Sequence, residues 1–177
     1  MNLLLRVPGV EFRLRDWAVQ DAPAIVKYAN NPKIAANLRD AFPHPYAFPD
    51  AEDFLKRALA SDPRVMFAIA TPQEAIGSIG LSPGKDVHRR TAELGYWLAE
   101  PFWGRGIVAA AVNAVVGYAF DSLGLVRVYA EPYAPNRASA RVLEKAGFQL
   151  EGIMRSSVVK TGKLLDQLLY ARIREGE

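Results

Sequence analysis

The chain has 177 residues, half of them apolar and 23% charged, which is typical of a single soluble globular domain and unlike a disordered or fibrous protein. Lys and Arg outnumber Asp and Glu by 22 to 19, and this net charge of +3 does not indicate nucleic acid as a partner. The absence of Cys excludes disulfides, thiolate metal sites and catalysis through an enzyme thiol, and with only two His residues, far apart, we expect no metal.

The first half of the chain predicts a strand, two helices and a hairpin. Apolar and charged residues alternate over 11–17, which favours a strand with one solvent-exposed face. Asp21 precedes a predicted helix over 22–29 as its N-cap, and helical spacing returns over 51–60. Between them, residues 30–48 form a loop rich in Pro and aromatic residues, which is either a packed cover or the wall of a substrate pocket. The stretches 65–70 and 75–81 predict an antiparallel hairpin around a short polar turn.

The second half predicts alternating strands and helices. Residues 91–98 form a strand whose residues Glu93 and Trp97 share one face. An unusually apolar helix over 106–123 ends at Gly124, and a short strand over 126–131 completes a βαβ unit with parallel strands. Asn136 starts a helix over 137–146, and two strands, 148–159 and 164–173, close the chain. These elements make one α/β (α+β) domain over residues 1–177.

Residues 103–108 lie between a predicted strand and a helix start, where free backbone N–H groups and the helix dipole attract an anion. Gly104 and Gly106 allow the main chain to approach a phosphate closely, because they have no Cβ. The turn matches neither a dinucleotide-binding fingerprint nor a Walker loop. A plain strand-to-helix turn explains the two glycines equally well.

Three ordered segments carry a resemblance to a known family: ELGYWL at 93–98, PFWGRGIV at 101–108 and NRASARVLEKAGF at 136–148. Their order resembles the acetyl-CoA-binding core of the GNAT superfamily of N-acetyltransferases. With LRDAFPHPY at 38–46, the chain looks more narrowly like the RimJ/RimL branch, named for ribosomal-protein-alanine N-acetyltransferases. The resemblance implies a mixed, mostly antiparallel sheet with helices on both faces and one parallel, splayed strand pair.

The resemblance also implies the ligand sites, with acetyl-CoA as cosubstrate. The pyrophosphate would lie on the main chain of the turn, and the pantetheine arm along the strand that ends at Leu98. Asn136 would contact the pantetheine, and Ser139 would lie near the thioester sulfur, although both also suit the start of a helix. The cofactor-binding residues are Leu98, Trp103, Gly104, Arg105, Gly106, Ile107, Val108 and Asn136.

The chain departs from the family pattern in two places. Pro101 stands where the superfamily often has Gln or Arg, and Ala109 and Ala110 stand where close relatives often have Thr and Glu. A hydroxyl that would assist the phosphate is therefore missing, but the backbone donors remain.

The predicted reaction is direct attack of a primary amine on the thioester, with Ser139 and Glu93 as catalytic residues. The base is Glu93, Asp166 or water, and the acceptor is a protein or peptide N-terminal α-amine or a small amine. The alternative is a non-catalytic sensor of acyl-CoA. The sequence leaves open the acceptor, the preferred acyl chain and the oligomeric state, for which a homodimer is one alternative.

The chain shows no targeting or membrane pattern. Residues 1–10 lack the charged and apolar regions of a secretory signal, and the longest uncharged run, 106–120, is too short to span a bilayer. We therefore expect a cytoplasmic protein without a membrane partner.

Overall fold

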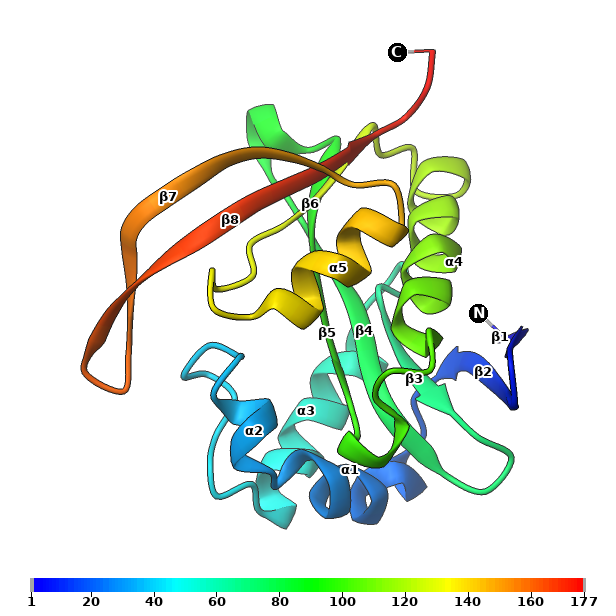
Figure 1. Ribbon diagram of the computed structural model, residues 1–177. Helices are drawn as coiled ribbons and strands as arrows, with labels where there is room; N and C mark the ends of the chain where they lie inside the picture. Colours follow the sequence, from blue (N-terminus) through cyan, green and yellow to red (C-terminus); the bar gives the residue numbers. More distant parts are fainter. Residues whose placement is uncertain (1, 177) are drawn as a thin grey trace. The chain divides into compact units, whose positions relative to one another are not determined.

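A computed structural model describes residues 2–176. Its eight strands form one mixed sheet in the order β1-β2-β3-β4-β5-β6-β8-β7 (Figure 1). The strands are β1 Asn2–Val7, β2 Val10–Asp16, β3 Met66–Ala70, β4 Ala75–Pro83, β5 Thr91–Leu98, β6 Arg127–Ala130, β7 Gln149–Lys160 and β8 Lys163–Ile173. The α-helices are α1 Ala22–Ala29, α2 Pro32–Ala35, α3 Phe48–Ala60, α4 Ile107–Asp121 and α5 Arg137–Lys145. The fold is the predicted one: a mostly antiparallel sheet with one parallel pair, β5 and β6.

The chain divides into two compact units. The first holds the residues up to Gly80 together with Tyr96–Ala111, and the second holds Leu81–Gly95 and the residues from Val112 onward. The elements β4, β5 and α4 each begin in one unit and end in the other. The prediction of a single domain over 1–177 stays a prediction.

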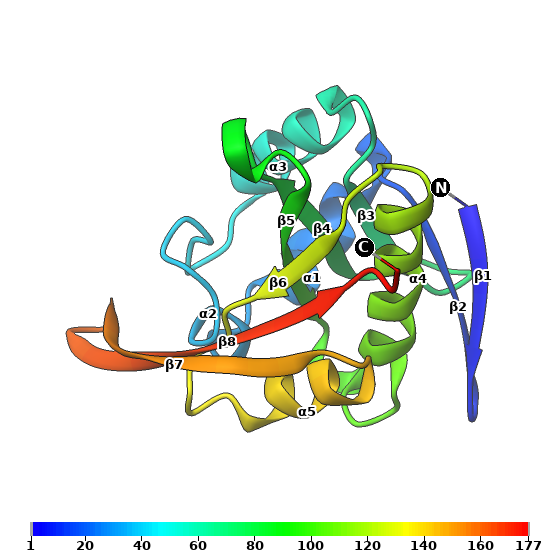
Figure 2. The same ribbon diagram turned by 90° about the horizontal axis from the view of Figure 1, so that it is seen from above.

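In the first unit, β1, β2 and β3 pair in antiparallel fashion, and β3 pairs with the start of β4. Figure 2 shows β1 and β2 side by side as a hairpin. Helices α1 and α3 contribute to a buried cluster that includes Trp17, Ile25, Tyr46 and Leu55. This cluster holds the segment before α3 in place, because Tyr46 belongs to both.

In the second unit, β6 and β7 lie on either side of β8, and β7 and β8 form a long hairpin (Figures 1 and 2). The parallel pairing joins Thr91 to Arg127 and Glu93 to Tyr129. Strand β5 continues beyond Glu93 to Leu98, so its end carries on into the turn before α4.

Four local predictions need correction. Strand β1 and helix α2 were not expected, and α3 begins at Phe48, three residues before the predicted start. Asp21 precedes α1 but makes no capping hydrogen bond with its side chain. Its carboxylate instead accepts two hydrogen bonds from Arg15, both at 2.7 Å, and one from the Ala18 N–H. A charged, bidentate partner is a stronger donor than a helical N–H, which explains the difference.

Candidate acyl-CoA site

The turn over residues 103–108 has the backbone conformation that only glycine adopts readily. Gly104 and Gly106 have φ angles of +76° and +80°. A Cβ at Gly104 would meet no atom within 4 Å, and one at Gly106 would meet only a Val7 methyl group at 4.0 Å. The glycines therefore do not serve close packing within the protein. They open a free approach to the main chain, as a ligand cradle requires.

Helix α4 supplies the donors of this turn. Its first helical hydrogen bond runs from the Ala110 N–H to the Gly106 carbonyl. The N–H groups of Ile107, Val108 and Ala109 therefore come before the hydrogen-bonded part of the helix, where the dipole is positive. Ile107 is fully buried and anchors the turn by its side chain. The main chain of residues 106–109 can thus bind the oxygens of a pyrophosphate.

Two side chains of the turn, those of Trp103 and Arg105, border the space through which a ligand would reach its main chain. Trp103 is 44% exposed, and its indole N–H donates to the Leu98 carbonyl at 2.7 Å, which folds the turn back onto the end of β5. Arg105 lies 5.7 Å from the Phe102 ring centroid and makes no ion pair among residues 2–176. Its charge is therefore available to a phosphate. Because the Leu98 carbonyl has a partner, a pantetheine amide beside this strand would use other main-chain groups.

In the second unit, Asn136 and Ser139 lie together at the start of α5. The Asn136 side-chain oxygen accepts the Ser139 N–H at 3.1 Å, so Asn136 is the N-cap of this helix, as predicted. The Asn136 amide group is not used by the cap. Ser139 occupies the first turn and is half-buried.

The two candidate bases also belong to the second unit, but they have different surroundings. Glu93 is half-buried on β5, beside Tyr129 in the parallel pair. Asp166 on β8 accepts the Ser156 N–H at 2.8 Å, and Ser156 has a φ of +49° where the β7–β8 register shifts. Asp166 therefore supports an irregular strand, a role that sequence reasoning missed because Ser156 is ten residues away.

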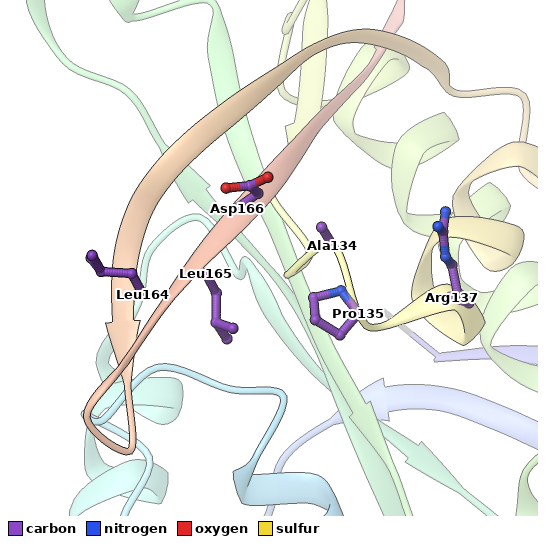
Figure 3. A pocket seen from close by; sticks show the side chains of 6 residues that line it. All are labelled: Ala134, Pro135, Arg137, Leu164, Leu165 and Asp166. Atoms are coloured by element: carbon purple, nitrogen blue, oxygen red, sulfur yellow. The ribbon is translucent and has the colours of Figure 1, made fainter.

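A hollow of about 400 Å³ lies beside Asp166. Figure 3 shows Leu165 and Asp166 of β8 opposite the loop residues Ala134 and Pro135, with Arg137 at the start of α5. The backbone connects the two sides, since the Ala134 N–H donates to the Asp166 carbonyl at 2.9 Å. The hollow thus adjoins, along the chain, the helix start that carries Asn136 and Ser139.

In the first unit, the loop over residues 30–47 packs its aromatic rings on β5. We call these residues the aromatic segment. The Phe42 ring lies 4.9 Å from that of Tyr46 and 6.2 Å from that of Trp97, between ring centroids. Phe42 and Trp97 remain half-exposed. The segment is therefore an ordered wall with accessible aromatic surface, and it contains the short helix α2.

Neither a metal site nor a membrane span is found in the described part of the chain. No three His, Asp or Glu side chains within residues 2–176 are grouped so that they could hold a metal ion. No helix of these residues is long and apolar enough to cross a membrane.

Together, the mixed sheet with its parallel pair and the open glycine turn at the start of α4 define the class of acyl-CoA-dependent transferases. Comparison with known proteins identifies the family. Residues 11–149 match the acetyltransferase (GNAT) domain. The chain therefore belongs to the GNAT family of N-acetyltransferases, which use acetyl-CoA as acyl donor.

The relatives include members of the RimJ/RimL branch. The putative ribosomal N-acetyltransferase YdaF of Bacillus subtilis is 33% identical over 100% of this chain and 94% of its own length. The uncharacterized N-acetyltransferase YoaA of the same organism is 37% identical, in a match that spans 59% of each chain. The structure of Mycobacterium smegmatis RimJ with CoA-disulfide has a TM-score of 0.87 at 25% identity, and the match covers 98% of this chain and 87% of RimJ.

Proposed function

We propose that the protein transfers the acetyl group of acetyl-CoA to a primary amine by direct attack, and that the acceptor is an N-terminal α-amine of a protein or peptide, or a small amine. The observation that carries the donor half is the glycine turn. Its two left-handed glycines face open space, and three helix-start N–H groups follow them. Residues Trp103 to Val108 hold the pyrophosphate, and Leu98 and Asn136 contact the pantetheine arm.

The transfer needs no covalent enzyme intermediate. The amine lone pair attacks the thioester carbon, the tetrahedral intermediate collapses, and CoA leaves as a thiolate that takes up the proton lost by the amine. Ser139 supports the departing thiolate with its hydroxyl, at the positive end of α5. The chain has no Cys that would carry an acetyl group. The kinetics should therefore be those of a ternary complex, not of a ping-pong mechanism.

The incoming amine must lose its proton before it attacks. A Lys side chain with an ordinary pKa near 10.4 is neutral in about one of 2,500 molecules at pH 7, whereas an α-amine near 7.8 is neutral in about one of seven. Glu93 is the favoured base because it lies on β5, the strand along which the pantetheine arm is proposed to lie, and Asp166 on β8 is the reserve. An α-amine suits this site better than an internal Lys, since it needs less help from a base.

The aromatic segment supports a peptide acceptor. The half-exposed rings of Phe42 in this segment and of Trp97 on β5 offer an apolar surface to the first side chains of a peptide, and β5 leads into the glycine turn. The name of YdaF points to a ribosomal acceptor for that relative. An accessible protein N-terminus is therefore the first acceptor class to test.

The test compares acetyl-CoA turnover on two sets of peptides by release of the free CoA thiol. One set has a free N-terminus and no Lys, and the other has a blocked N-terminus and one internal Lys. We expect faster release with the first set. Preference for the second set would overturn the α-amine proposal, and turnover on neither set but on a small amine would shift the acceptor class. Binding of acetyl-CoA without turnover on any amine would instead support an acyl-CoA sensor.

A further inference from the structure

Two side chains of the first unit meet at one carboxylate, that of Glu100. The Asn31 side-chain amide donates to Glu100 Oε2 at 2.8 Å, and the Lys33 ammonium pairs with Glu100 Oε1. Asn31 and Lys33 stand at the start of α2, whereas Glu100 begins the short 3₁₀ turn Glu100–Phe102 after β5. The hydrogen bond from Lys33, followed by that from Asn31, lowers the pKa of Glu100, so the carboxylate is ionised at neutral pH. We call these three residues the Glu100 cluster.

On one side, two members of the Glu100 cluster, Asn31 and Lys33, belong to the aromatic segment. The Asn31 side-chain oxygen accepts the Lys33 N–H at 2.9 Å and caps α2, so one Asn side chain bonds both to the helix and to Glu100. The neighbouring Asn30 oxygen accepts the Tyr46 N–H at 3.1 Å, near the other end of the segment. The segment is thus attached at its start through Glu100 and in its middle through the ring of Phe42.

On the other side, Glu100 is directly joined to the glycine turn. Its carbonyl accepts the Trp103 N–H at 3.1 Å, and the Ala99 N–H before it donates to the Ile76 carbonyl of β4 at 2.8 Å. The stretch from the end of β5 to the turn is therefore fixed by backbone hydrogen bonds. A side chain that bonds to Glu100 is therefore linked to the glycine turn through a short, hydrogen-bonded stretch of main chain.

We propose that Glu100 is a positioning residue for the acceptor: through Asn31 and Lys33 it fixes the aromatic segment relative to the glycine turn, so that the amine is presented to the thioester. This inference rests on the proposed function, because the acceptor contacts the segment and the donor contacts the turn. The cluster acts on acceptor binding and leaves the affinity for acetyl-CoA unchanged, since the carboxylate of Glu100 bonds to α2 and its main chain bonds to the turn.

The surroundings of Glu100 permit clean substitutions. The carboxylate borders a hollow of about 440 Å³, and the Glu100 side chain is 36% exposed. The residues around this hollow are Lys27, Tyr28, Asn30, Asn31, Glu100 and Pro101. A neutral amide at position 100 therefore has access to water and does not create a buried cavity.

The hydrogen bond between Asn31 and Glu100 can be broken by one substitution and restored by a second one that exchanges donor and acceptor. Asn31→Asp keeps the oxygen that caps α2 but replaces the donor by a carboxylate that repels Glu100. We expect the acceptor KM to rise roughly three- to tenfold, the range of a charge-assisted bond at a partly exposed site. Adding Glu100→Gln supplies a side-chain amide that donates to the carboxylate introduced at position 31. The double variant N31D/E100Q should therefore return to within about twofold of the wild-type KM.

Glu74 provides a matched control in the same unit. It also accepts from a Lys and a neutral donor, Lys27 at 2.6 Å and Tyr28 at 2.7 Å, but it lies in the β3–β4 turn. Glu74→Gln should leave the acceptor KM unchanged. In every variant, kcat and the calorimetric Kd for acetyl-CoA should stay within about twofold of wild type, which separates positioning from general destabilisation.

A second readout does not depend on turnover. Amide hydrogen exchange of residues 32–46 should be faster in N31D than in wild type, restored in N31D/E100Q and unchanged in E74Q. The proposal is overturned by an unchanged acceptor KM in N31D, by a double variant no better than N31D, or by a Kd for acetyl-CoA that rises in step with KM. If no amine is acetylated, the proposed function fails, and exchange rates that do not follow the expected order would refute the cluster separately.

Discussion

Replacement of Gly106 by Ala tests the acyl-CoA turn with the smallest possible change. Gly106 has a φ of +80°, and an Ala in this left-handed conformation costs about 1–2 kcal/mol of unfolding free energy. The new Cβ meets no protein atom closer than the Val7 methyl group at 4.0 Å, so no steric term adds to this cost. For a chain of this size the melting temperature should fall by about 2–8 °C, and the protein should remain folded.

The substitution should also weaken acetyl-CoA binding, by an effect that is separate from the cost in unfolding free energy. The methyl group projects into the open space above the turn, where the pyrophosphate is proposed to lie. We expect the Kd for acetyl-CoA to rise at least about tenfold, equivalent to ~1.4 kcal/mol, measured by isothermal titration calorimetry on the folded variant. Guanidinium unfolding of the same sample gives the stability cost independently.

Gly124 supplies the matched control at the other end of α4. It has a φ of +64°, and a Cβ there would also meet no atom within 4 Å. Gly124→Ala should therefore lose a similar unfolding free energy while binding acetyl-CoA like wild type. A folded Gly106→Ala variant with unchanged Kd, or equal losses of affinity in both variants, would refute the assignment of the turn as the pyrophosphate site.

Three further predictions concern turnover, pH dependence and a partly buried ion pair. Ser139→Ala should lower kcat at least about tenfold while the Kd for acetyl-CoA changes little, and equal losses in steady-state kinetics and calorimetry would mark Ser139 as a binding residue instead. Burial raises the pKa of Tyr46 to about 12, so the unfolded chain releases this proton first, near pH 10, and the unfolding free energy falls as the pH rises from about 10 to 12. Tyr46→Phe should make this decline shallower in urea unfolding at pH 9, 10 and 11, and an identical slope would contradict the reasoning. Asp21→Asn leaves the Arg15 charge without its bidentate partner and should lower the unfolding free energy by about 2–4 kcal/mol, whereas a loss below ~0.5 kcal/mol would show that water replaces the pair.

Local sequence signals predicted a large part of this protein. The bounds of α1, the glycines of the turn and the Asn136 cap were all readable, because each depends on residues within a few positions of one another. The unusual apolarity of α4 was also readable: Asn113 and Asp121 are its exposed residues, and the others are buried or half-buried. Strand β1 was missed because its run of three Leu residues does not alternate with polar ones, and only pairing with β2 makes it a strand.

The tertiary structure decided the partners of the polar side chains. Asn31 and Glu100 are 69 residues apart, and no local pattern indicates that they bond. The same holds for the contact of Phe42 with Trp97, which turns a Pro-rich loop into an ordered wall on β5. A turn or a cap forms between neighbours in the chain and can therefore be predicted from local sequence, whereas an ion pair between distant segments exists only after the sheet has brought them together.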